Sequence, residues 1–121
     1  MIQFKKLIKI KAGSTKIFNS NSIDLAFDDL SCEFFEKLSK KIFLLKKKNF
    51  SDLYSFAFFI RKSNIQKIKN KIQNENVLTG LGLAFHISPS NIPLGFAYSW
   101  YFSLLCGNRN IVKLPSNLST Q

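Results

Sequence analysis

Apolar residues along the middle of the chain recur with the period of an α-helix. From about Asp28 they are spaced by four, four, four and three positions, which is typical of one apolar stripe on an amphipathic helix. Asp28 and Asp29 suit the N-terminus of this helix and the lysines at 46–48 suit its C-terminus, because these charges complement the helix dipole. The stripe consists of Leu30, Phe34, Leu38, Ile42 and Leu45.

Two further helices are predicted in the lysine-rich region that follows. Ser51 is typical of an N-cap, with Asp52 in the first turn and an apolar segment that extends to Ile60. A third amphipathic segment ends near residues 74–76, and its apolar positions are Ile65, Ile68 and Ile72. We expect these helices to form a packing layer whose aromatic residues belong to the core.

The pattern changes again after Val77. Residues 80–87 are an apolar run that predicts a buried strand, and residues 88–93 are a loop interrupted by two prolines. Residues 94–105 are apolar on nearly every face, so this helix should be buried on several sides. Gly107-Asn108 then predicts a helix stop, and residues 110–114 a second strand that ends before Pro115.

The order strand, loop, helix, strand predicts a right-handed crossover with two parallel strands. Pro93 can occupy the first turn of the helix, and Ser90 or Asn91 can cap it. Ligands of such sheets bind at the carboxyl ends of the strands. The loop at 88–91 and the segment at 113–116 should therefore be neighbours in space.

The composition predicts a folded chain of one domain. Its 121 residues are 45% apolar, and the formal charge is +11, with 16 of the 18 cations being lysine. Bidentate phosphate recognition and base recognition favour arginine, so we expect a solvated cationic face and no nucleic-acid partner. Residues 1–76 hold 16 cations and 7 acids, or +9, whereas residues 77–121 hold two cations and no acid. The two regions therefore have different roles.

The cysteines and the apolar segments of the sequence favour a cytoplasmic location. Cys32 and Cys106 have no paired spacing that would suggest a metal site or a disulfide framework. Alternating apolar residues at 2–10, followed by a turn at 12–15, predict a short strand or hairpin arm, and its lysines interrupt any signal-peptide pattern. About twelve residues of apolar helix span roughly 18 Å, which is too short for the ~30 Å core of a membrane.

Three short motifs carry a resemblance to a known family. The sequence His86-Ile-Ser-Pro-Ser-Asn-Ile-Pro93, then Gly107-Asn108 and Ile111-Val-Lys113, resembles the N-terminal cofactor region of the aldehyde dehydrogenase superfamily. The closest subgroup is the acyl-CoA reductase family of the bioluminescence pathway, which has a His-Ile-x-Pro-x-Asn pattern. The resemblance is strong over residues 77–121 and only weakly marked over residues 28–70.

The resemblance implies roles for individual residues. Asn91 matches the family asparagine whose amide helps to form the oxyanion hole for the thioester carbonyl, a donor worth about 2.7–4 kcal/mol of barrier. The alternative is that Asn91 only caps the next helix. Lys113 matches the lysine that reaches the adenosine ribose of the cofactor, and its alternative is a solvated lysine at a strand end. Ile87, Ser88 and Pro89 match the loop that borders the cofactor.

One position departs from the pattern of the superfamily. The common pattern has an acidic residue three positions after the lysine, where this chain has Ser116. An acid repels a 2′-phosphate and a serine does not, so the resemblance implies NADPH as the preferred cofactor, with NAD as the other possibility. His86, at the end of an apolar strand, is expected to be a hydrogen-bonded packing residue rather than a catalytic one. Cys106 is not expected to be the nucleophile, which lies farther along the chain in the family.

Together these features predict an α/β fold. An N-terminal arm and helical layer at 1–76 precede the beginning of a Rossmann-like parallel-sheet cofactor domain at 77–121, incomplete in this chain. The resemblance implies reduction of a fatty acyl-CoA or other acyl thioester to an aldehyde through an acyl-cysteine. We expect the fragment alone to be inactive and to assemble with the rest of the enzyme chain or with further copies. The alternatives are a small basic module that binds nucleic acid or an anionic membrane surface, and the product of an interrupted reading frame.

Overall fold

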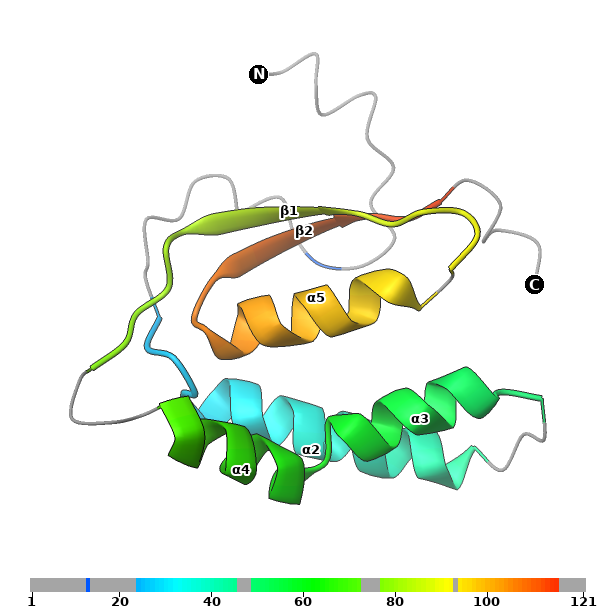
Figure 1. Cartoon of the computed structure of the whole chain (residues 1–121), viewed down its shortest axis with the longest axis horizontal. Helices are drawn as coiled ribbons and strands as arrows, with labels where there is room; N and C mark the ends of the chain where they lie inside the picture. The colour runs from blue at the N-terminus through cyan, green and yellow to red at the C-terminus, as the bar shows by residue number, and fades with distance from the viewer. Residues whose placement is uncertain (1–12, 14–23, 46–48, 73–76, 93, 116–121) are drawn as a thin grey trace, which may run out of the picture.

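Three layers make up the part of the chain that the computed structural model describes, namely residues 13, 24–45, 49–72, 77–92 and 94–115. A two-stranded sheet forms one outer layer, a single helix lies beneath it, and three helices form the other outer layer (Figure 1). The elements in chain order are α2 (Asp29–Leu44), α3 (Ser51–Phe59), α4 (Lys62–Ile72), β1 (Leu83–Ile87), α5 (Gly95–Leu105) and β2 (Arg109–Lys113). The predicted arm at 2–10 lies outside the described residues, as does the turn at 12–15 apart from Gly13.

Helix α2 begins where the sequence predicts. Asp28 is its N-cap, and the carboxylate accepts a hydrogen bond of 3.0 Å from the backbone N–H of Ser31. Asp29 follows in the first turn, and Lys41 lies in the last turn. Each charge therefore lies at the end of the helix that it stabilises.

The buried face of α2 differs from the predicted stripe. Leu30, Phe34 and Leu45 are 80%, 45% and 52% exposed, so this part of the prediction is wrong. The residues that the helix buries are Phe35, Ser39 and Ile42. Phe35 and Ser39 each follow a residue of the predicted stripe by one position, so the buried face is rotated from that stripe. The reason is that Phe35 packs against α5. Its ring lies edge-to-face against the rings of Trp100 and Tyr101, at centroid distances of 5.2 and 4.8 Å.

A serine fixes the distance between α2 and α3. The buried hydroxyl of Ser39 donates a 2.7 Å hydrogen bond to the backbone carbonyl of Ala57, which is itself fully buried. Ala57 lies in the last turn of α3, where carbonyl groups lack helical partners. A small polar side chain on the predicted polar side of α2 therefore holds the two helices together.

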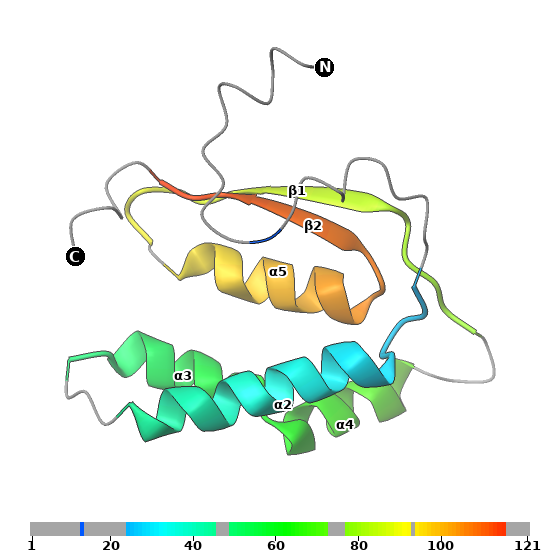
Figure 2. The ribbon, with the colours of Figure 1, turned by 180° about the vertical axis from the view of Figure 1, so that it is seen from behind.

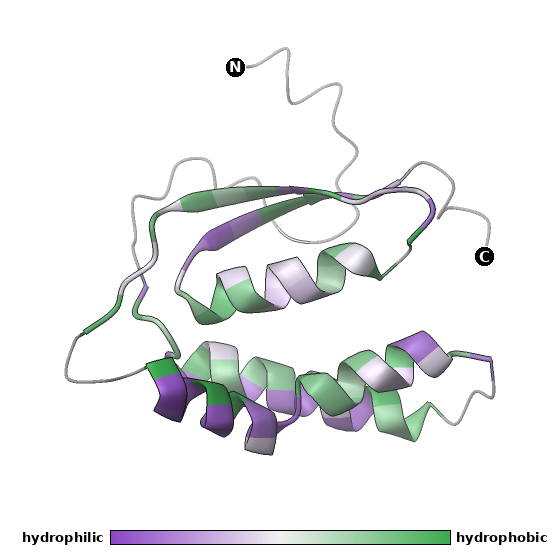
Figure 3. Ribbon diagram, viewed as in Figure 1, coloured by the Kyte–Doolittle hydropathy of each residue, from purple (hydrophilic) through white to green (hydrophobic). Residues whose placement is uncertain are grey.

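Helices α3 and α4 confirm the two predicted amphipathic segments, with one correction at a cap. Ser51 is the first residue of α3 rather than its N-cap, because the non-helical residue is Phe50, with φ −122° and ψ 52° and no side-chain cap. In α4, Ile65 is buried, while Ile72 is 46% exposed at the end of the helix. Figure 3 shows the strong alternation of hydrophilic and hydrophobic positions in α4.

The two strands are parallel neighbours, as predicted. Their register pairs Leu83 with Arg109 and Ile87 with Lys113. The first strand is shorter than the predicted run from Gly80, because the backbone there pairs elsewhere: Gly80 N–H donates to the carbonyl of Asp24 at 3.1 Å. The helical layer is thus joined to the beginning of the sheet.

Two glycines allow this junction. A Cβ atom on Gly80 would collide with the backbone carbonyl of Gly107, and one on Gly107 would collide with that of Asp24. Gly107 also has φ +87° and ends α5, where its N–H donates to Leu104. The predicted helix stop is confirmed, since only glycine adopts this conformation without strain.

Helix α5 lies between the sheet and the helical layer, which confirms the prediction of burial on several sides (Figure 2). The predicted caps are wrong. Its N-cap is Leu94, without a side-chain cap, because Ser90 and Asn91 lie too far upstream of Gly95 to reach the free N–H groups of the first turn. Pro93 lies outside the described residues. None of the described helices has the length and apolar character that crossing a membrane requires.

Within the described residues nothing covers the outer face of the sheet, which corrects the prediction that β1 is buried. Leu83, Phe85 and Ile87 point away from α5 and are 45%, 60% and 69% exposed. Alternate residues of a strand face opposite sides of the sheet, and α5 covers only one side. The outer positions of β1 are therefore apolar and exposed, whereas Ala84 and His86, on the side of α5, are partly buried.

Candidate functional site

The carboxyl ends of β1 and β2 bring the predicted site segments together. Ile87 pairs with Lys113 in the register of the sheet. One residue farther on, the N–H of Ser88 donates a 3.1 Å hydrogen bond to the carbonyl of Lys113. The loop after β1 and the end of β2 are therefore neighbours, although 25 residues of sequence separate Ser88 from Lys113.

Ser88 is the buried polar residue of this edge. It is 6% exposed, and its hydroxyl oxygen is buried without a hydrogen-bond partner in the part of the chain that the structure describes. A hydroxyl that stays unpaired destabilises the fold by about 1–3 kcal/mol unless a ligand or water meets it. The edge thus holds a polar group that is available for an additional partner.

Asn91 and Lys113, the residues predicted to contact the thioester and the cofactor, have exposed side chains. Asn91, in the turn after β1, and Lys113, the last residue of β2, are both exposed, as is Pro89. Neither the Asn91 amide nor the Lys113 ammonium forms a hydrogen bond or ion pair with another described residue. The backbone brings both to one end of the sheet, but no contact joins them. Ser116 lies outside the described residues.

His86, on β1, is hydrogen-bonded to two other elements, in keeping with the packing role that we expect for it. Its Nε2 atom lies 2.8 Å from Asn110 Oδ1 on β2, and its Nδ1 atom lies 3.2 Å from Ser99 Oγ on α5. The amide nitrogen of Asn110 donates to the carbonyl of Asn108 at 2.7 Å, which leaves Oδ1 as the acceptor for His86. The Nε2 atom donates to this oxygen when the imidazole proton is on Nε2.

Asn108 and Asn110 hold the beginning of the sheet together, a role that the sequence did not predict. Asn108 Oδ1 accepts hydrogen bonds from the backbone N–H groups of Leu81 and Gly82, at 2.7 and 3.2 Å, and so fixes the chain just before β1. In the sequence, Asn108 indicated only a helix stop. The signal available in the sequence was the alternation of Asn108 and Asn110 at the beginning of the strand that was predicted to pair with the strand of His86.

The cysteines lie away from this edge. Cys106 is exposed at the end of α5, beside the amino end of β2 and thus opposite the candidate site. Burial raises the pKa of the Cys32 thiol, which disfavours the reactive thiolate. Both thiols are free. Cys106 therefore lies at the end of the sheet opposite to that of Asn91 and Lys113.

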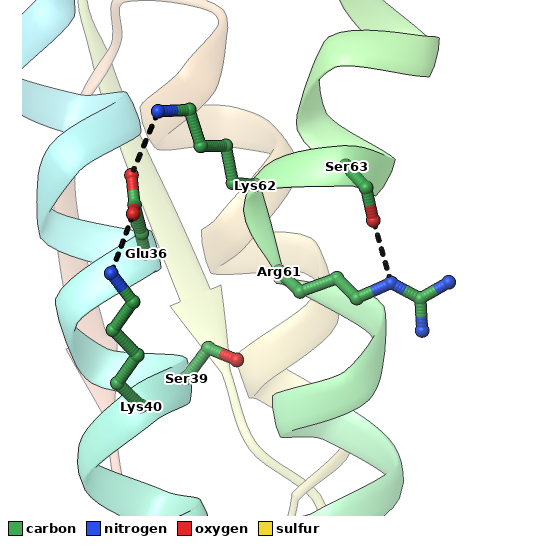
Figure 4. A pocket seen from close by; sticks show the side chains of 6 residues that line it. All are labelled: Glu36, Ser39, Lys40, Arg61, Lys62 and Ser63. Carbon is green, nitrogen blue, oxygen red and sulfur yellow. Dashed lines mark hydrogen bonds and ion pairs between the residues drawn. The ribbon is translucent and has the colours of Figure 1, made fainter.

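Two cavities lie elsewhere in the molecule. One, of about 260 Å³, lies between α2 and the beginning of α4 (Figure 4). There Glu36 accepts a 2.7 Å hydrogen bond from Lys40 and lies 3.8 Å from the ammonium of Lys62. The hydrogen bond from Lys40 lowers the pKa of the Glu36 carboxyl. The guanidinium of Arg61 points away from these groups, over the ring of Phe58 at 3.4 Å. The Glu36 carboxylate therefore links α2 to α4, and the cluster keeps a net positive charge because one carboxylate faces two ammonium groups.

The second cavity, of about 300 Å³, lies at the amino ends of the strands and is lined by Leu78, Gly80, Cys106 and Asn108 among others. Within the described residues, no three His, Cys, Asp or Glu side chains gather in a way that could hold a metal ion. Comparison with protein families, curated proteins and solved structures finds no match to the chain.

Proposed function

We propose that the chain is the N-terminal portion of an NAD(P)H-dependent acyl-CoA reductase, which converts a fatty acyl-CoA or related thioester to an aldehyde through an acyl-cysteine. The observation that carries the proposal is the junction between Ser88 and Lys113. It supports a ligand site at the carboxyl edge of a parallel sheet, where cofactors of such sheets bind. Asn91 and Lys113, which lie near this junction, would contact the thioester and the cofactor.

Each side chain has a distinct task in this proposal. The amide of Asn91 donates to the oxygen that gains negative charge when the thioester carbonyl is attacked. The ammonium of Lys113 binds the ribose of the cofactor, and Ser116, which carries no charge, does not repel a 2′-phosphate. Ile87, Ser88 and Pro89 form the wall between them. Because the Asn91 and Lys113 side chains have no other described partner, both are available to a ligand.

The outer face of the sheet, which no described residue covers, supports a place within a larger assembly. Parallel strands are normally covered on both faces, and here α5 covers one. A layer from the rest of the enzyme chain, or from another copy, would remove the apolar side chains of β1 from water.

Binding of cofactor fragments tests the proposal without requiring the nucleophile. We expect the chain to bind adenosine 2′,5′-bisphosphate more tightly than 5′-AMP, as measured by calorimetric titration. Lys113→Ala should weaken binding by roughly ten-fold, because a charge-assisted hydrogen bond is lost. Lys67→Ala is the matched control, since this exposed lysine lies on α4. Equal weakening by both substitutions, or no binding, would contradict the proposal.

A second assay concerns turnover. The 121 residues with NADPH and a long-chain acyl-CoA should form no aldehyde, since the proposed acyl-cysteine requires a nucleophile that the candidate site does not contain. In a longer polypeptide that includes this chain and reduces acyl-CoA, Asn91→Ala should lower kcat by about 10²–10³-fold. Aldehyde formation by the 121 residues alone would overturn the assignment of the nucleophile.

A further inference from the structure

Three polar side chains form a row of hydrogen-bonding groups between α5 and the sheet. Ser99 lies in the middle of α5, and its Oγ atom is 3.2 Å from the Nδ1 atom of His86 on β1. The other ring nitrogen, Nε2, is 2.8 Å from the Oδ1 atom of Asn110 on β2. The order is thus hydroxyl, imidazole and amide, and each group lies within hydrogen-bond distance of the next.

The amide of Asn110 sets the direction of these contacts. Its nitrogen donates to the carbonyl of Asn108 at 2.7 Å, so the oxygen is the atom that faces the ring. Because this oxygen only accepts, a neutral imidazole completes the contact with its proton on Nε2, which leaves Nδ1 as an acceptor towards Ser99. The contacts that give the imidazole its packing role therefore also present it to the hydroxyl as a base.

The hydroxyl is open to a reactant, whereas the base is held in place. Ser99 is exposed, while His86 and Asn110 are partly buried. The carbonyl of Phe96, at 3.0 Å, is a second acceptor for the hydroxyl proton. The proton moves between the two acceptors by rotation of the hydroxyl alone, so no part of the fold has to move. A serine hydroxyl beside an oriented imidazole is the arrangement that activates a nucleophile.

The surroundings of Ser99 favour an acyl group as the reactant. Phe102 lies one turn along the same face of α5 and is 43% exposed. An apolar ring beside the hydroxyl suits the alkyl part of an ester or a thioester. The N–H groups in the middle of a helix donate to carbonyls of the preceding turn and do not serve as oxyanion donors. Turnover should therefore be slow, and covalent capture is the suitable measurement.

We propose that Ser99 is a nucleophile that His86 activates and that accepts an acyl group from an activated ester or thioester. Its Oγ atom forms a bond to the carbonyl carbon, its proton passes to Nδ1, and the leaving alkoxide or thiolate departs with that proton. Water then attacks the acyl-serine in the same way and releases a carboxylic acid. Asn110 is a positioning residue, because it holds the imidazole. The proposal goes beyond the reductase function and does not depend on it.

Covalent labelling of the full 121-residue chain tests the proposal. A serine-directed fluorophosphonate bonds to Oγ with loss of fluoride, and mass spectrometry of the peptides identifies the labelled residue. We expect labelling at Ser99 to be roughly a hundred-fold faster than at Ser55, because a positioned base contributes about that much. Ser55 is the matched control, since it is an exposed serine within α3. Brief incubation with p-nitrophenyl acetate should place an acetyl group on the same residue.

Substitutions separate activation of the hydroxyl from its exposure. Ser99→Ala should abolish the fast labelling, and Ser55→Ala should leave it unchanged. His86→Gln should slow labelling at Ser99 by roughly a hundred-fold. Asn110→Leu should slow it as well, whereas Asn110→Asp should keep it fast, because a carboxylate also accepts from Nε2. Far-UV circular dichroism identifies the variants that fold, and the comparison of Ser99 with Ser55 in the wild type requires no variant.

Either of two results would end the proposal. One is labelling of the wild type at equal rates at Ser99 and Ser55, which would show an ordinary exposed hydroxyl. The other is an unchanged rate at Ser99 in a folded His86→Gln variant, which would show that the imidazole is not the base. Loss of binding to adenosine 2′,5′-bisphosphate, in contrast, would count only against the reductase proposal.

Discussion

Removing the hydroxyl of Tyr101 should stabilise the protein. The residue is fully buried, and its hydroxyl is a polar atom without a hydrogen-bond partner among the described residues. Its ring is held edge-to-face by Phe35, Phe59 and Phe102 at centroid distances of 4.8, 5.6 and 5.1 Å. Because these contacts involve the ring alone, Tyr101→Phe keeps them and deletes only the unpaired group.

The expected gain follows from two opposing effects. An unsatisfied buried hydroxyl destabilises the folded state by about 1–3 kcal/mol. Its removal leaves a void of roughly 10 Å³, which costs about 0.2 kcal/mol at about 24 cal/mol per Å³. The free energy of unfolding should therefore rise by about 1–3 kcal/mol.

Urea unfolding followed by circular dichroism measures this gain. With a slope of about 1 kcal/mol per molar for a small protein, the midpoint should rise by about 1–3 M. Tyr98→Phe is the control: Tyr98 is only half-buried against Phe56 and Phe59, so its substitution should change stability by less than about 0.5 kcal/mol. A fall in the midpoint for Tyr101→Phe would show that the hydroxyl has a stabilising partner and would refute the reasoning.

Three further predictions concern pH, a backbone junction and the histidine network. Burial raises the pKa of Tyr101 from 10.0 to about 12, so the folded state keeps a proton that the unfolded state has lost; the free energy of unfolding should fall as pH rises from about 10 towards 12, and Tyr101→Phe should flatten that fall in urea titrations at each pH. Gly107→Ala should lower the thermal midpoint through strain at φ +87° and a collision with a backbone carbonyl, by more than Gly82→Ala, where φ is +132° but the surrounding space is open. His86→Phe leaves the side-chain oxygen of a half-buried asparagine without its donor and should cost about 1–2 kcal/mol in urea unfolding, whereas Ser99→Ala, at an exposed hydroxyl, should cost less than about 0.5 kcal/mol; equal losses would show that the imidazole is not the stabilising member.

Helix positions could be predicted from the sequence better than helix faces. Periodicity and the Asp28 cap located α2, but the buried face is decided by what packs against it. The ring of Phe35 meets α5, and Ser39 bonds to a carbonyl of α3, neither of which is visible in local spacing. A polar serine in a buried position is an exception that only the tertiary contact explains.

The strands show the same limit. Parallel pairing followed from the order of elements, and the neighbouring positions of Ser88 and Lys113 followed from it. Sequence hydrophobicity could not indicate that one face of β1 is uncovered in the described part of the chain, because an apolar strand has the same pattern whether one or two layers cover it. For the candidate site, the backbone arrangement was predictable. The roles of Asn91 and Lys113 in chemistry rest on the resemblance and stay predictions.

The hydrogen bonds made by the residues before α2 have a consequence for dissecting the chain. Asp24 and Ala26 bond to the backbone just before β1, and Phe27 N–H donates to the carbonyl of Leu105 at the end of α5. A cut between the helical layer and the strands would break these hydrogen bonds and expose the buried side chains around them to water. Expression of residues 77–121 by themselves should therefore give an unfolded peptide, and the shortest unit worth producing begins before Asp24.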